Sequence, residues 1–124
     1  MKYKPLQRKN PQAPQAAGKW YAAPVNAGTI TQRAVSNEIV ELSSLTRGDV
    51  SSVIDNLLVA VPKYLLMGNS VNLGSLGTFR LSFSSKGVDT PAEVNANLIS
   101  GVKVIFTPSS ELREKLRQAK FEKA

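Results

Sequence analysis

The side chains that could do chemistry in this sequence are mostly cations. Its 124 residues include 16 Lys and Arg against 9 Asp and Glu, a formal net charge of +7, and neither Cys nor His. Without these two residue types there are no disulfides, thiolate metal sites, Cys nucleophiles or Ser-His-Asp triads. An enzyme would have only Lys, Tyr, Ser and carboxylates to work with, so we do not expect an enzyme.

No local motif indicates a metal, cofactor or nucleotide site. The acidic residues lack the spacing of a metal cage, and no phosphate-loop or dinucleotide fingerprint is present. The segment "GSLG" (residues 74–77) matches the GxxG of a KH-type RNA-binding loop, but that loop joins two helices and this one is predicted to join two strands. We therefore expect no cofactor, no metal and no small-molecule substrate.

One set of cations has helical spacing. Arg113, Arg117 and Lys120 recur at i, i+4 and i+7 in "PSSELREKLRQAKFEKA", which opens with a proline and a serine cap. Leu112 and Leu116 are expected to point toward the core from the same helix. A basic stripe of this kind is either a binding surface or, more often, a solvated helix face.

Length and composition fit one small domain with an extension. The start, "MKYKPLQRKNPQAP", has no apolar run behind its basic residues, and no segment approaches the ~20 apolar residues of a membrane span. We expect a cytoplasmic protein that contacts no membrane. A chain of about 100 residues buries only about two-thirds of its unfolded surface, so association is a natural way to gain burial.

Residues 1–28 differ from the rest of the chain. They hold four prolines and five Lys or Arg with no acid, a composition that on its own fits a mobile basic tail. A free tail has no need of Trp20 and Tyr21, however, so we expect two short strands, near residues 3–7 and 20–25. A polar loop around residues 11–18 would join them.

Two helices should follow. Apolar residues recur at helical spacing after a Thr31 cap, "LTRGD" then breaks the pattern, and Thr46 caps a second helix with Asp49 at its third position. Pro62 should bend this helix or begin its last turn. The wide apolar stripe of the second helix needs more cover than one short helix and a small sheet supply, which predicts a partner subunit. The stripe consists of Val50, Val53, Ile54, Leu57, Leu58, Val61 and Leu65.

After residue 70 the apolar pattern has a period of two. "VNLGSLGTFRLSF" (residues 71–83) predicts two strands around a glycine turn, and "VKVIF" (residues 102–106) predicts a third. The eighteen residues between them, 84–101, have little hydrophobic character. This segment is too long for an ordinary hairpin loop and is either a protruding two-stranded arm or a disordered excursion.

The order of these elements resembles a known family. Over about residues 29–121 the sequence is similar to the bacterial histone-like proteins HU and integration host factor. The similarity lies in the order helix, "LTRGDV", helix, "VNLGSLGTF", arm, "VKVIFTPS" and final helix. "YKPLQRKNP", "YAAPV" and "VPKYLLMGNSVNLGSLGTFRL" look like the HU-related subfamily with an N-terminal extension. The resemblance implies an α+β fold with an N-terminal helical hairpin, a three-stranded antiparallel sheet with a protruding β-arm, a C-terminal helix and short N-terminal strands.

The same resemblance implies a function. In such proteins two subunits interlock their helices, and two β-arms with basic residues and a proline near the tip reach into the DNA minor groove. We therefore expect a non-enzymatic homodimer that binds double-stranded DNA with low sequence specificity and condenses it in the cytoplasmic nucleoid. Residues 29–124 would be the HU-like DNA-binding domain and residues 1–28 a basic, Pro-rich extension.

The tip of the expected arm departs from the family pattern. The family typically has Arg-Asn-Pro there, whereas this sequence has Asp89, Thr90 and Pro91. Pro91 matches the proline wedge, but Asp89 would face phosphate, and residues 82–103 hold two Lys against two acids. The candidate DNA-binding residues therefore lie on the arm, at its base and on the last helix: Arg80, Lys86, Pro91, Lys103, Arg113, Arg117 and Lys120.

Two other functions are consistent with the sequence. The neutral arm and the unusual extension fit an HU-like scaffold with weak or no DNA binding that acts as a protein interaction module through Trp20, Tyr21 and Val25. RNA binding fits the basic charge as well, but the sequence lacks a recognisable platform of exposed aromatic residues for stacking bases.

Overall fold

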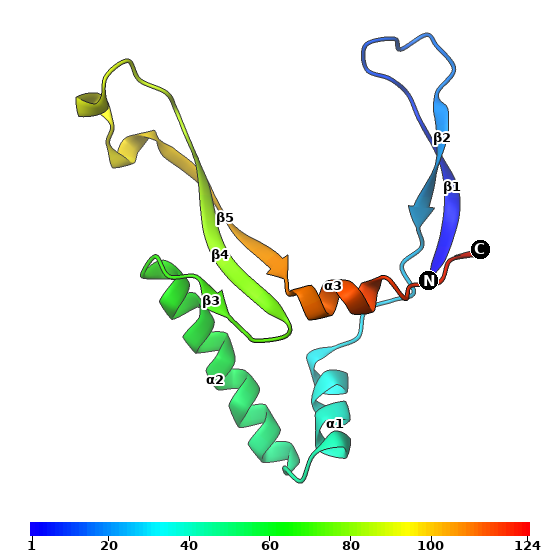
Figure 1. Cartoon of the computed structure of the whole chain (residues 1–124), viewed down its shortest axis with the longest axis vertical. Coiled ribbons are helices and arrows are strands. Elements are labelled where there is room, and N and C mark those ends of the chain that lie inside the picture. The colour runs from blue at the N-terminus through cyan, green and yellow to red at the C-terminus, as the bar shows by residue number, and fades with distance from the viewer.

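The computed structural model describes all 124 residues as a mixed α+β chain with three helices and two three-stranded sheets (Figure 1). The α+β class predicted from the sequence is confirmed. The helices are α1 (Gln32–Leu42), α2 (Arg47–Leu66) and α3 (Ser110–Leu116). The first sheet, in the order β2-β1-β6, consists of β1 (Lys2–Arg8), β2 (Lys19–Pro24) and β6 (Glu122–Lys123). The second consists of β3 (Val71–Asn72), β4 (Gly77–Ser85) and β5 (Ile99–Pro108).

Side-chain caps define the starts of α1 and α2. The Thr31 hydroxyl accepts a hydrogen bond from the Ala34 N–H at 3.2 Å. At α2 the Thr46 hydroxyl accepts from the Asp49 N–H, and the Asp49 carboxylate accepts from the Thr46 N–H, both at 3.1 Å. This reciprocal pair satisfies two N–H groups that the helix itself cannot. Pro62 lies at the start of the last turn of α2, where the helix continues to Leu66.

The second sheet extends into a long hairpin. β4 and β5 are antiparallel from Gly77 opposite Pro108 to Ser85 opposite Ile99, with an irregularity between Ser82 and Ser84. Residues 86–98 close the hairpin and include two short 3-10 helices, η1 (Pro91–Glu93) and η2 (Ala96–Leu98). Figure 1 shows the hairpin extending well beyond the helices. We call residues 82–103 the β-arm.

The backbones of β4 and β5 approach closely at Gly77. This buried residue has φ +149°, and a Cβ added to it would overlap the Thr107 carbonyl oxygen and lie 2.7 Å from the Phe106 ring. The Phe106 ring packs against Phe79, with 4.9 Å between centroids. Only glycine fits here, because any side chain would push the strands apart.

The first sheet joins the two ends of the chain. β1 and β2 pair from Tyr3 opposite Pro24 to Arg8 opposite Lys19, so the strands predicted near residues 3–7 and 20–25 are confirmed. We call residues 1–28 the N-terminal hairpin. β6, which the sequence did not predict, runs parallel to β1. No helix of the chain has the length and apolar character that crossing a bilayer requires.

The last helix is shorter than predicted. α3 ends at Leu116, so Lys120 is not on a helix, and Leu116 is exposed instead of facing a core. Beyond the helix the last residues of the chain bond to Met1 and to β1. The Met1 ammonium donates to the Lys120 carbonyl at 2.9 Å, and the Glu122 N–H donates to the Met1 carbonyl at 3.1 Å.

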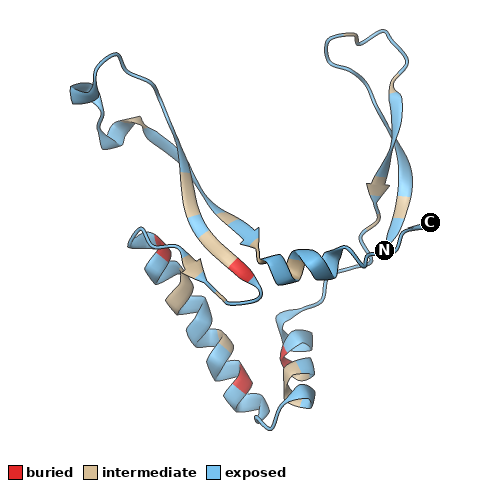
Figure 2. Cartoon of the chain, viewed as in Figure 1, coloured by how far each residue is buried: buried red, intermediate tan, exposed pale blue.

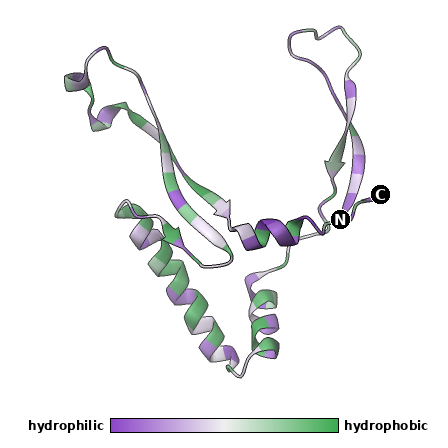
Figure 3. Ribbon diagram, viewed as in Figure 1, coloured by the Kyte–Doolittle hydropathy of each residue, from purple (hydrophilic) through white to green (hydrophobic).

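A single chain fully buries very few residues. Only 4 of 124 residues are buried, and Figure 2 shows them scattered over α1, α2 and the start of β4. Figure 3 shows hydrophobic residues along α2 and β5, and several of them are exposed. The buried members of the α2 stripe are Val50 and Leu65, whereas Val53, Leu57 and Leu58 are exposed.

We predict that Gly77→Ala lowers the free energy of unfolding by about 1–3 kcal/mol, because the added methyl group must displace backbone at a packed position. Gly87→Ala is the matched control, since nothing lies within 4 Å of its added Cβ. Urea unfolding followed by circular dichroism measures both variants. Equal midpoints for the two would contradict the close approach at Gly77.

The α2 cap should make stability depend on acid pH. Hydrogen bonds from the Thr46 side chain and then its backbone N–H lower the pKa of the Asp49 carboxyl. The cap therefore contributes stability above the unfolded-state pKa of about 3.9, and this is lost as pH falls through the lower folded-state pKa. Unfolding curves measured from pH 2 to 6 give the free energy of unfolding as a function of pH, and Asp49→Asn should flatten its acidic part. At neutral pH, Thr46→Ala should lower the free energy of unfolding by about 1 kcal/mol. An Asp49→Asn profile parallel to that of the unmodified protein would refute this.

Candidate nucleic-acid interface

The base of the β-arm brings two of the predicted cations together. Arg80 on β4 lies opposite Ile105, and Lys103 on β5 lies opposite Ser82. Since alternate residues of a strand share a face, Arg80 and Lys103 are diagonal neighbours on one face of the sheet, with Cα atoms about 7–8 Å apart. Both side chains are exposed and neither forms an ion pair. We call these two residues the arm base.

The tip of the β-arm presents Pro91 to solvent. Pro91 is the first residue of η1, where its missing N–H costs no hydrogen bond. The Thr90 hydroxyl donates to the Glu93 carboxylate at 2.9 Å, which holds that negative charge beside the proline. Asp89 is exposed and, like Glu93, forms no ion pair. The tip therefore combines an exposed proline with two acids that form no ion pair.

Lys86 begins the connection between β4 and η1. Its N–H donates to the Leu98 carbonyl at 3.0 Å, which closes the strand pair, while its side chain is exposed. Lys86 and Pro91 thus lie at the far end of the arm from Arg80.

The three cations expected on the last helix do not form one stripe. Arg113 lies within α3, and Arg117 is the residue that ends it. The Arg117 guanidinium pairs with the Glu114 carboxylate at 3.1 Å on a highly exposed surface, where such a pair adds little stability. Lys120 lies beyond the helix, in the link to β6. The seven predicted residues therefore occupy three separate places in one chain: the arm base, the outer arm, and α3 with its link.

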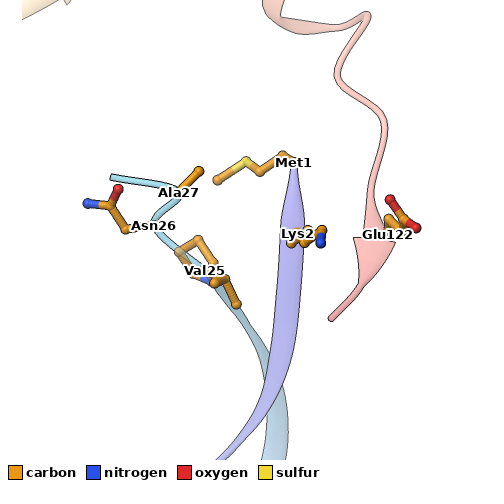
Figure 4. Close-up of a pocket in the computed structure, with 7 residues that line it drawn as sticks. Met1, Lys2, Val25, Asn26, Ala27 and Glu122 are labelled. Carbon is orange, nitrogen blue, oxygen red and sulfur yellow. The ribbon is translucent and has the colours of Figure 1, made fainter. Parts of the chain in front are cut away.

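The largest pocket lies outside these places, where the N-terminal hairpin meets β6. It is open to solvent and its only charged side chains are those of Lys2 and Glu122, so it has no set of side chains that converge on a ligand. Figure 4 shows the Met1 side chain directed toward Ala27 at its rim. The pocket is lined by Met1, Lys2, Pro24, Val25, Asn26, Ala27 and Glu122.

Two solved structures have the same fold. A protein of Bacteroides vulgatus that is proposed to be a bacterial DNA-binding protein is 18% identical with a TM-score of 0.62, over 98% of this chain. This chain covers 47% of that protein, about half its length. HU from Anabaena, crystallised with DNA, is 17% identical with a TM-score of 0.56, over 73% of this chain and 100% of that one. At these identities the likeness shows the fold alone, which is that of HU.

No curated protein sequence is significantly similar to this chain. The chain nevertheless belongs to the HU-HIG family, described as an HU domain fused to a wHTH, Ig or glycine-rich motif, which it matches over residues 1–123. This confirms the HU-related resemblance seen in the sequence. The match includes the N-terminal hairpin, so that hairpin is part of what the family shares.

Proposed function

We propose that this protein is a non-enzymatic, HU-like architectural DNA-binding protein that acts as a homodimer. The observation that carries the proposal is the arm base, where Arg80 and Lys103 share an exposed face beneath an arm with Pro91 at its tip. Family membership supports it, as does the fold likeness to an HU protein that binds DNA. Residues 29–124 would be the DNA-binding domain, and the protein would act in the cytoplasmic nucleoid.

The charge distribution determines the proposed mode of binding. Arg80 and Lys103 would neutralise phosphates and release counterions, which gives affinity without reading sequence. Pro91 would insert between base steps in the minor groove and so favour DNA that bends easily. The acids near the tip would repel phosphate, and Lys86 is the only cation of the arm beyond the arm base. Most of the affinity should therefore come from the arm base and the body of the protein. Arg113, Arg117 and Lys120 would provide further contacts.

A second copy of the chain would supply the missing core. Val53, Leu57 and Leu58 on α2 and Val102, Val104 and Phe106 on β5 are exposed in one chain. Monomeric proteins rarely expose apolar surface of this extent, and an isologous dimer would bury both faces at once. Dimerisation would also place two β-arms on one body.

One observation favours the alternative function, an HU-like scaffold that acts as a protein interaction module. The β-arm carries Lys86 and Lys103 against Asp89 and Glu93, and neither acid is paired. An arm with no net charge would add little electrostatic attraction to DNA. If the protein does not bind duplex DNA even at low salt, this alternative replaces the proposal.

The arm base is tested by Arg80→Ala with Lys103→Ala. The double variant should bind unrelated duplexes more weakly by similar factors, and its slope of log affinity against log salt should decrease by about 0.9 for each phosphate that is no longer neutralised. Fluorescence anisotropy with labelled duplexes at several salt concentrations measures both effects. Arg33→Ala with Lys63→Ala, on α1 and α2, removes the same charge elsewhere. If the two double variants match, the arm base is not the site.

The dimer is tested on α2. Val53→Asp should dissociate the protein into poorly folded monomers, because a carboxylate would enter an apolar interface. Ser52→Asp, at an exposed position on the polar side of the same helix, should leave the protein dimeric. Sedimentation equilibrium at micromolar concentration reports the mass. A monomeric unmodified protein would overturn the proposal, and so would a Val53→Asp variant that stays dimeric.

A further inference from the structure

We propose that one face of the N-terminal hairpin is a second phosphate-binding surface for the same DNA. This inference rests on the proposed function, because it adds a binding surface to that complex. The five cations of residues 1–28 are not among the seven candidate DNA-binding residues. The strand register of the structure places four of them on a common face.

Alternation in the two strands sorts the side chains by charge. Lys2, Lys4 and Arg8 occupy even positions of β1 and so point to one side, and Lys19 of β2 lies directly opposite Arg8. All four side chains are exposed. We call these four residues the basic face.

A side-chain contact confirms this assignment. Tyr21 lies opposite Leu6 and should share the basic face, and the Arg8 guanidinium carbon lies 5.8 Å from the centre of its ring. Tyr3, Pro5, Trp20 and Ala22 lie on the other side by the same alternation, and they line a shallow pocket together with Lys123 and Tyr21, which also contacts this edge of the sheet. The hairpin therefore has one cationic face and one aromatic, apolar face.

Little opposes the positive charge of this face. Residues 1–28 contain no Asp or Glu, and Glu122 on β6 is the only acidic side chain in the sheet. Glu122 lies beside Lys2 in the register but forms no ion pair with it. Four exposed cations in two strands, with an aromatic ring among them, suit a phosphodiester backbone better than a single small anion, because phosphates repeat along a strand.

The position of the hairpin allows it to reach DNA held at the arm base. α3 begins directly after β5, and β6 follows it after a short link, so α3 connects the two hairpins. Figure 1 shows both hairpins extending to the same side of α3. A helix of seven residues is about 10 Å long, well within one turn of duplex DNA at about 34 Å. The proposal requires one duplex to bridge α3 and its link and to contact both hairpins.

The test compares two matched single variants, a charge-removing triple variant and a charge-retaining control in the full chain. It uses salt-dependent anisotropy with a duplex of about 30 base pairs, long enough for nearly three helical turns. Lys4→Gln should weaken binding and reduce the salt slope by about 0.9 if it neutralises one phosphate. Lys123→Gln, which removes one exposed charge from the opposite face of the same sheet, should change neither. Lys4→Gln with Arg8→Gln and Lys19→Gln should reduce the slope further, and the charge-retaining Lys4→Arg, Arg8→Lys and Lys19→Arg variant should restore it.

The outcomes separate this inference from the proposed function. If the unmodified protein binds DNA but the triple variant behaves like Lys123→Gln, the basic face is wrong and the arm base stands. If the triple variant has a reduced slope while Arg80→Ala with Lys103→Ala does not, the basic face stands alone. No binding by the unmodified protein at low salt overturns both. Equal affinity for phosphatidylserine vesicles, abolished in the same triple variant, would reassign the basic face to lipid headgroups and overturn the inference.

Discussion

The contact between the turn at residues 73–77 and the end of β5 determines where the other parts of the chain lie. Gly77 pairs with Pro108 at a backbone distance that excludes any side chain. Ser109, the next residue, donates through its hydroxyl to the Ser75 carbonyl and caps α3 by accepting from the Leu112 N–H. The base of the β-arm and the start of α3 are therefore fixed together, and α3 leads on to β6 and the N-terminal hairpin.

The remaining architecture depends on surface that one chain leaves uncovered. Val50 and Leu65 are buried against the chain itself, while Val53 and Leu58 on the same helix are 60% and 59% exposed. A helix that is apolar on more than one face is normally buried on both. This explains why so few residues form a core, and it links folding to association: the proposed two-armed DNA-binding surface would exist only where two chains meet.

Local patterns predicted the elements, whereas the site depended on contacts between distant segments. The caps at Thr31 and Thr46 and the turn at Gly77 follow from residue type and spacing, and the structure has all three. Helical spacing alone suggested that Lys120 continues α3. The helix ends at Leu116, and Lys120 instead accepts a hydrogen bond from the Met1 ammonium, a contact across 119 positions that no local pattern contains. The signal for the basic face was present in the alternation of "KYKPLQR", but only the β1–β2 register adds Lys19 to it.

In the proposed complex, the cations that would attract DNA lie away from Pro91, the residue that would insert into it, and this affects how binding would work. In an arm that carries both, attraction to phosphate draws the proline into the groove, but here the β-arm beyond its base has one cation, Lys86, against two acids, Asp89 and Glu93. Attraction between exposed charges falls off over about 10 Å at 0.1 M salt, so the proposed insertion of Pro91 would depend on cations that hold the duplex nearby. Arg80 and Lys103 at the arm base and the basic face of the N-terminal hairpin occupy such positions. A grip of this kind makes affinity strongly salt-dependent and leaves deformability at the wedge as the source of preference among sequences.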